Sequence, residues 1–279
     1  MKLHQDELHK YFGLANKHNS WLKTPTNLFD FVDNDSDMLV VTIGDSWTYG
    51  ANLDSESRNK IVYGAQLAQL MSADWLNLAI PAQGNFWIAH MVERLSAIIP
   101  KLTYGSIYCV CTFTDPTRWF NTHFDQHVNY IQWFADNLHV VDDFDLFLAM
   151  RNQLCVNKIL EHLSPFDHVH LRVGTNFIEH TGLEQLQPEQ LLPKPWYRVL
   201  GLNDNTDVKV IFYYSKIETI TEFISQNKHS MFQNWLLKTT ALSNLRLNLL
   251  LTANDFKNCH PLADSHATWA TYIYDSIQK

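Results

Sequence analysis

Polar residues that could perform nucleophilic chemistry directly follow the first buried segment of the chain. Residues 38–43 are apolar and β-branched, as in a central strand of a parallel sheet, and the pattern ends at Gly44, Asp45 and Ser46. A serine in this place can expose its hydroxyl as a nucleophile, close to backbone N–H groups that stabilise an oxyanion. Asp and Ser also commonly cap a turn or a helix. This tripeptide alone supports both interpretations equally.

Strand and helix patterns alternate after this segment. A helical pattern over residues 60–71, a strand over 75–80, a helical pattern over 86–100 and a strand over 106–113 follow one another. Strands separated by helices of this length predict right-handed crossovers and a parallel sheet covered on both faces. Ligands bind beyond the carboxyl ends of the strands in such sheets, so Ser46 lies where a site is expected.

The second half of the chain has fewer regular patterns. Residues 142–163 predict a long amphipathic helix, expected as an insertion that covers the carboxyl ends of the strands or their edge. Residues 168–173 and 208–214 predict the fourth and fifth strands. Turn signals without a sustained period indicate a long loop or lid over residues 174–207. A helix is expected to close the chain.

Length and charge limit the classes of function. We predict that the 279 residues form a single domain, in which residues 1–37 are an N-terminal helical extension. The formal net charge of −8 argues against nucleic acid as a partner, because that partner needs clustered Lys and Arg. No apolar run approaches the roughly 20 residues that span a bilayer, and the N-terminus is too polar for a signal peptide. We therefore expect no membrane partner and a cytoplasmic location.

The four cysteines predict a reducing compartment, since they show neither the density of a disulfide scaffold nor the spacing of a zinc site. Cys109 and Cys111 alternate within the predicted strand 106–113, so both should face one side of it as small core residues. The 14 histidines also lack a metal-ligand pattern. We expect no metal and no cofactor.

Four sequence blocks resemble, in order, those of the SGNH/GDSL hydrolase superfamily. They are GDSWTYG at residues 44–50, NLAIPAQGN at 77–85, TFTDPTR at 112–118 and NCHP at 258–261. The resemblance implies an α/β fold, a flavodoxin-like three-layer α/β/α sandwich with a mostly parallel five-stranded sheet. It also implies hydrolysis of an ester, acetyl group or thioester through a serine nucleophile. The partner would then be a small-molecule or carbohydrate ester substrate.

The resemblance also implies the catalytic pair. Ser46 matches the nucleophile, with its own backbone N–H as the first oxyanion donor, and His260 matches the general base. A histidine within hydrogen-bond reach takes the serine proton and later gives it to the leaving group. A rival assignment uses His266 with Asp264, although His266 matches a residue within the last helix of many family members.

The acid of the triad departs from the family pattern. The family places this acid three residues before the histidine, where the chain has Lys257. The remaining candidates are Asp255, five residues before His260, and Asn258, two residues before it. If Asn258 orients the imidazole, we expect a catalytic dyad or poor activity.

The second and third blocks depart from the family as well. Ala82 stands where a glycine supplies an oxyanion N–H, with Gly84 and Asn85 just after it. Thr114 stands where an asparagine amide completes the oxyanion hole. Removing one such donor costs on the order of 10²–10³ in rate, so either Asn85 has taken over this role or the activity is low.

Candidates for substrate contact stand next to three strand ends. The aromatic residues there predict an apolar or sugar-stacking cleft, which we favour because three separate strand ends carry them, although aromatic residues after strands are also ordinary core. These residues are Trp47, Tyr49, Phe86, Trp87, Trp119 and Phe120. Arg118 could bind a carboxylate or a sugar hydroxyl, or could form a salt bridge. The candidates for substrate binding are Asp45, Trp47, Trp87 and Arg118.

Two functions are compatible with these residues. The first is a serine-dependent esterase or carbohydrate O-deacetylase that acts through a Ser46 acyl-enzyme. The departures in the second, third and last blocks support the alternative, a catalytically weak or inactive protein of the same fold. Such a protein would serve in binding or assembly, with carbohydrate recognition or association with a virion as its setting.

Overall fold

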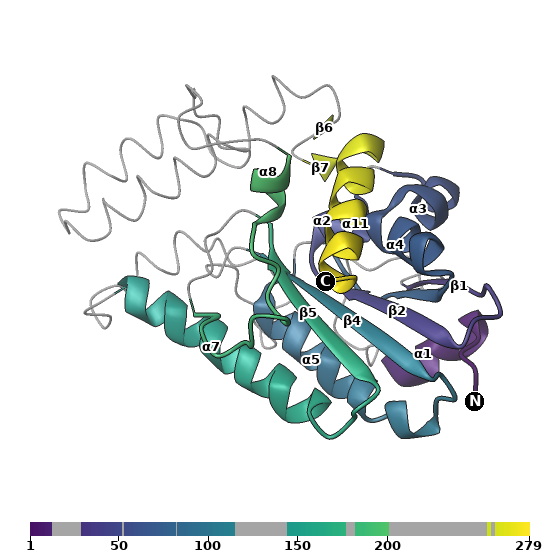
Figure 1. The fold of residues 1–279 in the computed structure, drawn as a ribbon, viewed down its shortest axis with the longest axis horizontal. Helices are drawn as coiled ribbons and strands as arrows, with labels where there is room; N and C mark the ends of the chain where they lie inside the picture. Colours follow the sequence, from purple (N-terminus) through teal and green to yellow (C-terminus); the bar gives the residue numbers. More distant parts are fainter. Residues whose placement is uncertain are drawn as a thin grey trace, which may run out of the picture.

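The fold is a five-stranded sheet between two layers of helices (Figure 1). The computed structural model describes residues 1–12, 29–51, 53–81, 83–114, 144–176, 182–200, 256–257 and 260–279. The strands of the sheet are β1 (Asp30–Val32), β2 (Met38–Ile43), β3 (Asp74–Asn77), β4 (Ser106–Phe113) and β5 (Val169–Thr175). Their order is β1-β3-β2-β4-β5, in which the pairs β3–β2, β2–β4 and β4–β5 are parallel. The predicted α/β class with a mostly parallel sheet is confirmed.

The fifth strand of the sheet differs from the predicted one. β1 pairs antiparallel with the outer edge of β3 and comes from the segment 1–37, which was expected to be helical. The described part of that segment also contains a 3₁₀ turn (Gln5–Glu7) and helix α1 (Leu8–Phe12). A three-residue edge strand is too short to give a readable hydrophobic period. The predicted strand over 208–214 lies outside the described residues.

Alternation along the strands divides the core into two halves. Leu39, Val41 and Ile43 of β2 face one side, and Val40 faces the other. The first side is covered by α1, α5 (Asn85–Ser96) and α7 (Phe144–Leu163). The second side is covered by α4 (Tyr63–Met71) and α11 (Ala263–Ile277), as Figure 1 shows. β2 therefore runs through the middle of the molecule, which requires its apolar character.

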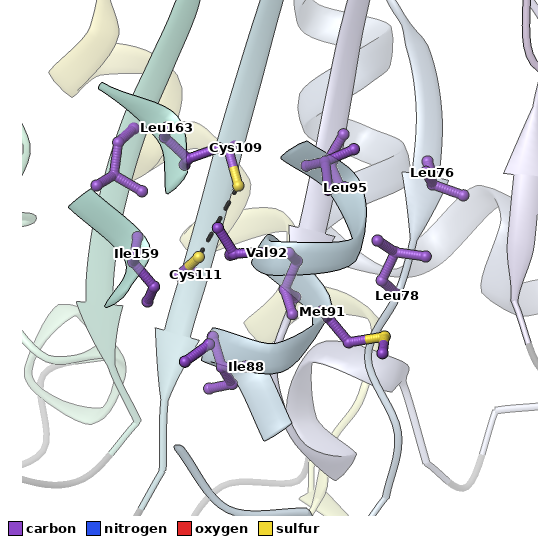
Figure 2. Close-up of a cluster of buried hydrophobic side chains, with 14 of the residues drawn as sticks. Leu76, Leu78, Ile88, Met91, Val92, Leu95, Cys109, Cys111, Ile159 and Leu163 are labelled. Atoms are coloured by element: carbon purple, nitrogen blue, oxygen red, sulfur yellow. Dashed lines mark hydrogen bonds between the residues drawn. The ribbon is translucent and has the colours of Figure 1, made fainter. Parts of the chain in front are cut away.

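The prediction that Cys109 and Cys111 are core residues on one face of their strand is confirmed, because both belong to the core on the side covered by α1, α5 and α7. Cys109 and Cys111 are both fully buried on the same face of β4, and their Sγ atoms are 3.9 Å apart (Figure 2). Side chains of α5 and α7 pack over them. Those labelled in Figure 2 are Ile88, Met91, Val92 and Leu95 of α5, and Ile159 and Leu163 of α7.

The predicted helix over 60–71 is divided at Val62. Residues Ser55–Ile61 form α3, Tyr63–Met71 form α4, and Val62 between them has the extended backbone angles φ −58° and ψ 141°. The interruption has a physical consequence, because it frees the Tyr63 N–H from the helix ladder. That N–H donates instead to Nδ1 of His266 on α11, at 3.2 Å.

The predicted helix over 142–163 is present as α7 but has a different place. It is the crossover between β4 and β5 and packs beside α5 on one face of the sheet, so it is not an insertion over the strand ends (Figure 1). Within the predicted loop 174–207, the described residues 182–200 hold turns, one parallel bridge between Val173 and Leu191, and the one-turn helix α8 (Trp196–Val199).

Within the described ranges, no helix combines the length and the apolar character needed to cross a membrane.

Candidate active site

Ser46 opens a one-turn helix at the carboxyl end of the central strand. Gly44 and Asp45 separate β2 from helix α2 (Ser46–Tyr49), and Ser46 is 6% exposed. Gly44 permits this tight turn, because a Cβ at that position would lie 2.2 Å from Thr48 Oγ1 and 3.1 Å from the Thr112 carbonyl oxygen. The Ser46 hydroxyl makes no hydrogen bond to any described residue.

Asp45 holds the turn from inside the protein. Its side chain is fully buried, and Oδ1 accepts a hydrogen bond from the Trp47 N–H at 2.9 Å, which caps α2. Oδ2 accepts from the Thr114 hydroxyl at 2.8 Å, and Oδ1 accepts from Nδ2 of Asn176 at 2.9 Å. Thr114 follows β4 and Asn176 follows β5, so one carboxylate joins the ends of three strands. Asp45, expected to contact substrate, faces protein donors here.

Thr114 and Asn85 are engaged with each other. The Thr114 N–H donates to Oδ1 of Asn85 at 2.9 Å, and Nδ2 of Asn85 donates to the Thr114 carbonyl at 3.1 Å. Nδ2 of Asn85 also donates to Oδ1 of Asn152 on α7 at 2.8 Å. The hydroxyl hydrogen of Thr114 and both amide hydrogens of Asn85 therefore have acceptors within the protein. Neither side chain has a donor left for an oxyanion in this arrangement.

Backbone donors near Ser46 come from two helix starts. The Ile80 N–H donates to the Gly44 carbonyl at 3.2 Å, so the chain that follows β3 runs beside the Ser46 turn. That segment leads to Gly84, the residue before α5, and no side chain caps the start of α5. The first N–H groups of a helix have no partner in the helix ladder. In α2 the Trp47 N–H is capped by Asp45, and in α5 the Trp87 N–H donates to the Gly84 carbonyl at 3.0 Å. Ala82 lies outside the described residues.

The last hairpin brings the strand that contains His260 next to α2, the helix that Ser46 begins. Strand β6 (Phe256–Lys257) pairs antiparallel with β7 (His260–Pro261), and β7 lies beside α2 (Figure 1). The structure describes the backbone of His260 and not its side chain. Asp255, Asn258 and Arg118 lie outside the described residues, and their assigned roles stay predictions.

The rival histidine is a core residue. His266 is fully buried, and its Nδ1 accepts the hydrogen bond from the Tyr63 N–H. Its ring stacks on Tyr63 and meets Trp196 edge-on, with ring centroids 6.3 Å and 5.2 Å apart. Burial lowers the pKa of His266 to about 3, and the Pro261 carbonyl opposes this shift. Its helical spacing with Trp269 and Ile273, on the buried face of α11, is a signal for a core position.

The expected aromatic contacts differ in their exposure. Trp47 and Trp87 are each only 3% exposed, and Trp47 packs edge-on against Trp196 with ring centroids 5.1 Å apart. Among the described aromatic residues that follow the strand ends, Phe86 is 37% exposed and Tyr49 is half-buried, while Trp119 and Phe120 lie outside the described residues. Trp196 lies within the region 174–207, which was expected to be a loop or lid over the carboxyl ends of the strands.

Sequence reasoning missed Asn176. It directly follows β5, as Thr114 follows β4, and this position after a buried strand is the signal that could have identified it. Among the described residues, no group of three His, Cys, Asp or Glu side chains is placed to hold a metal ion.

Comparison with known proteins finds similarity in structure, at low sequence identity. No protein-family profile matches the chain, and no curated protein matches it. A lipolytic protein of the GDSL family from Veillonella parvula aligns at 12% identity over 87% of this chain and 99% of that chain, with a TM-score of 0.39. A putative lipolytic GDSL protein from Desulfitobacterium hafniense aligns at 13% identity over 85% of this chain and 98% of that chain, with a TM-score of 0.36.

A carbohydrate esterase family 2 enzyme from Corynascus thermopiles aligns at 13% identity over 86% of this chain and 65% of that chain, with a TM-score of 0.39. The chain thus has structural matches, over most of its length and at low identity, to SGNH/GDSL hydrolases and carbohydrate esterases. Such matches concern the arrangement of the helices and the mostly parallel sheet.

Proposed function

We propose that the protein is a serine-dependent ester hydrolase in which Ser46 is the nucleophile and His260 the general base. The observation that supports this proposal is the contact between β7, the strand that contains His260, and α2, the helix that Ser46 begins. Serine is a poor nucleophile unless a base takes its proton, so the proximity of a histidine gives the Ser46 position its chemical meaning.

The proposed reaction has two halves. Ser46 Oγ attacks the ester carbonyl while His260 takes its proton, and the protonated His260 then gives that proton to the leaving alcohol. Water, deprotonated by His260, hydrolyses the acyl-enzyme in the second half. Asp255 or Asn258 is the proposed orienter of the imidazole. Ser46 N–H is the first proposed oxyanion donor.

The other oxyanion donors in this proposal are backbone groups. The N–H groups at the start of α5, around Gly84 and Asn85, and that of Ala82 follow the segment that pairs with the Ser46 turn. A helix start suits this role, because its first N–H groups have no partner in the helix ladder and its dipole favours negative charge. The substrate class would be a small carboxylic ester or an O-acetylated carbohydrate.

One observation favours a second candidate function, a binding or assembly protein with little catalysis. The Thr114 hydroxyl donates to Asp45, and both amide hydrogens of Asn85 have acceptors in the protein. The oxyanion hole would then lack a side-chain donor. The loss of one donor lowers the rate by on the order of 10²–10³, which is enough to leave binding as the main activity.

A fluorophosphonate probe and p-nitrophenyl acetate hydrolysis separate the two functions. We expect the wild type to be labelled and to turn over the ester, and Ser46→Ala to lose both. Ser164→Ala is the matched control, because Ser164 is exposed and follows α7 at the opposite, amino-terminal end of the strands. A wild type without labelling or turnover refutes the enzyme and supports the binding protein.

His260→Gln tests the base separately. This variant should keep the Ser46 site folded but lose most labelling, because the serine hydroxyl would then lack a base. Labelling of His260→Gln at the wild-type rate would contradict the assignment of His260.

A further inference from the structure

Three fully buried side chains fasten the Ser46 turn to two neighbouring strands. The Asp45 carboxylate accepts hydrogen bonds from Thr114 and from Asn176, and none of the three side chains has measurable exposure. Asp45 also caps α2 through the Trp47 N–H. The turn therefore cannot shift relative to the ends of β4 and β5 without breaking hydrogen bonds to a buried carboxylate, which are stronger than those between neutral groups.

Further hydrogen bonds connect this cluster to the helices α5 and α7. Asn85 at the start of α5 binds the backbone of Thr114 through its amide oxygen and nitrogen, and Asn152 on α7 accepts from the same amide. Thr114 is thus held on its backbone and on its hydroxyl at the same time. A nucleophile supported in this way has one defined position, and misplacement of reacting groups by about 1 Å can cost about 10²-fold in rate.

Asn176 has a feature that stability alone does not explain. Its Nδ2 donates to Asp45, while its Oδ1 is buried and has no hydrogen-bond partner among the described residues. An unpaired buried amide oxygen opposes folding. The opposite amide orientation would place that oxygen against the Asp45 carboxylate. What the side chain supplies in this position is a donor for Asp45.

We propose that Asn176 and Thr114 are positioning residues for Ser46, and that both act through the buried Asp45 carboxylate. This inference rests on the proposed function. It assigns Asp45 to the support of the nucleophile rather than to substrate contact. It also assigns the Thr114 hydroxyl to Asp45 rather than to the oxyanion.

Asn176→Leu is the first test, since leucine has a similar size and no donor. Tyr104→Phe is its matched control, because the Tyr104 hydroxyl donates to the buried Asp74 carboxylate at 2.8 Å at the opposite end of the sheet. Each variant removes one hydrogen bond to a buried carboxylate. We expect Asn176→Leu to slow fluorophosphonate labelling about tenfold or more and to lower kcat for p-nitrophenyl acetate with little change in KM.

Tyr104→Phe should label at the wild-type rate although its thermal stability also falls. Wild-type labelling of Asn176→Leu would refute the proposal. Equal slowing in Tyr104→Phe would refute it too, because the effect would then follow from lost stability.

Substitutions of Thr114 distinguish a role in positioning Ser46 from direct contact with the substrate. Thr114→Val should slow labelling as Asn176→Leu does, Thr114→Ser should restore most of the rate, and the double variant Thr114→Val/Asn176→Leu should be less than additive. If Thr114→Val slows labelling while Asn176→Leu does not, Thr114 acts on the substrate itself and the positioning role is refuted.

Amide hydrogen exchange measures the restraint on the Ser46 turn independently of catalysis. Exchange in residues 44–51 should be faster in Asn176→Leu than in the wild type and unchanged in Tyr104→Phe. Unchanged exchange in Asn176→Leu refutes the restraint, whatever the activity. A wild type that is unreactive refutes the proposed function and the catalytic part of this inference, while faster exchange in Asn176→Leu would still support the restraint on the turn.

Discussion

His266 should make the protein sensitive to acid in a way that one substitution can isolate. Burial lowers the pKa of His266 from its ordinary value of about 6.5 to about 3, so the folded protein keeps the ring neutral. The unfolded chain takes up a proton below about pH 6.5. The free energy of unfolding is therefore unaffected by this group above about pH 6.5, and it decreases as the pH falls from about 6.5 towards 3, because only the unfolded chain takes up the proton.

The size of the effect follows from proton linkage. A pKa of about 3 in the folded state and about 6.5 in the unfolded state lowers the free energy of unfolding by about 2 kcal/mol between pH 7 and pH 5. The total reaches about 5 kcal/mol below pH 3, as an upper bound on the same argument. Other groups titrate in this range, so the prediction concerns a difference between two proteins.

His266→Asn is the suitable variant, because its Oδ1 can still accept the Tyr63 N–H that Nδ1 of His266 accepts. The smaller side chain should lower stability at every pH, whereas the acid-dependent part should disappear. Urea denaturation at pH 7 and pH 5 measures this directly. The wild type should lose about 2 kcal/mol more than the variant between these values.

Equal losses in the two proteins would refute the reasoning. They would mean that His266 can be protonated in the folded state and therefore reaches solvent. His266 would then return as a candidate base for Ser46.

Three further substitutions test packing and exposure at the Ser46 turn and elsewhere in the fold. Arg58→Met should lower the free energy of unfolding by about 3–5 kcal/mol, because it leaves the buried Asp30 without the guanidinium 3.3 Å away. The double variant Asp30→Asn/Arg58→Met should recover part of this loss. Thermal denaturation measures both variants, and an unchanged Tm in Arg58→Met would contradict the prediction. Gly44→Ala should lower both the Tm and the rate of fluorophosphonate labelling, because the added Cβ clashes with Thr48. Adding Thr48→Ala should recover part of both losses. Labelling of Gly44→Ala at the wild-type rate would show that the clash does not disturb the site. Leu154→Gln should change the free energy of unfolding by less than about 0.5 kcal/mol, since Leu154 is 55% exposed on α7, and a larger loss would mean that this surface is covered.

The central strands and the place of Ser46 could be predicted from the sequence alone. A strand buried on both faces must be apolar throughout, so residues 38–43 and 106–113 are recognisable as β2 and β4 without knowledge of their neighbours. The chain must also leave such a strand at its carboxyl end, which puts Ser46 on that edge of the sheet. The same local logic identified Cys109 and Cys111 as neighbours on one face.

Only the tertiary structure decided which polar and aromatic side chains are enclosed. Asp45 and Asn176 are 131 residues apart in the chain, and nothing local to either residue predicts their hydrogen bond. Trp47 is buried because Trp196 packs against it, and His266 is buried between Tyr63 and Trp196. Residue type and spacing follow from the chain itself, whereas burial depends on what distant segments pack against a side chain. The support of Ser46 by Asp45 and Asn176 is for that reason a property of the fold.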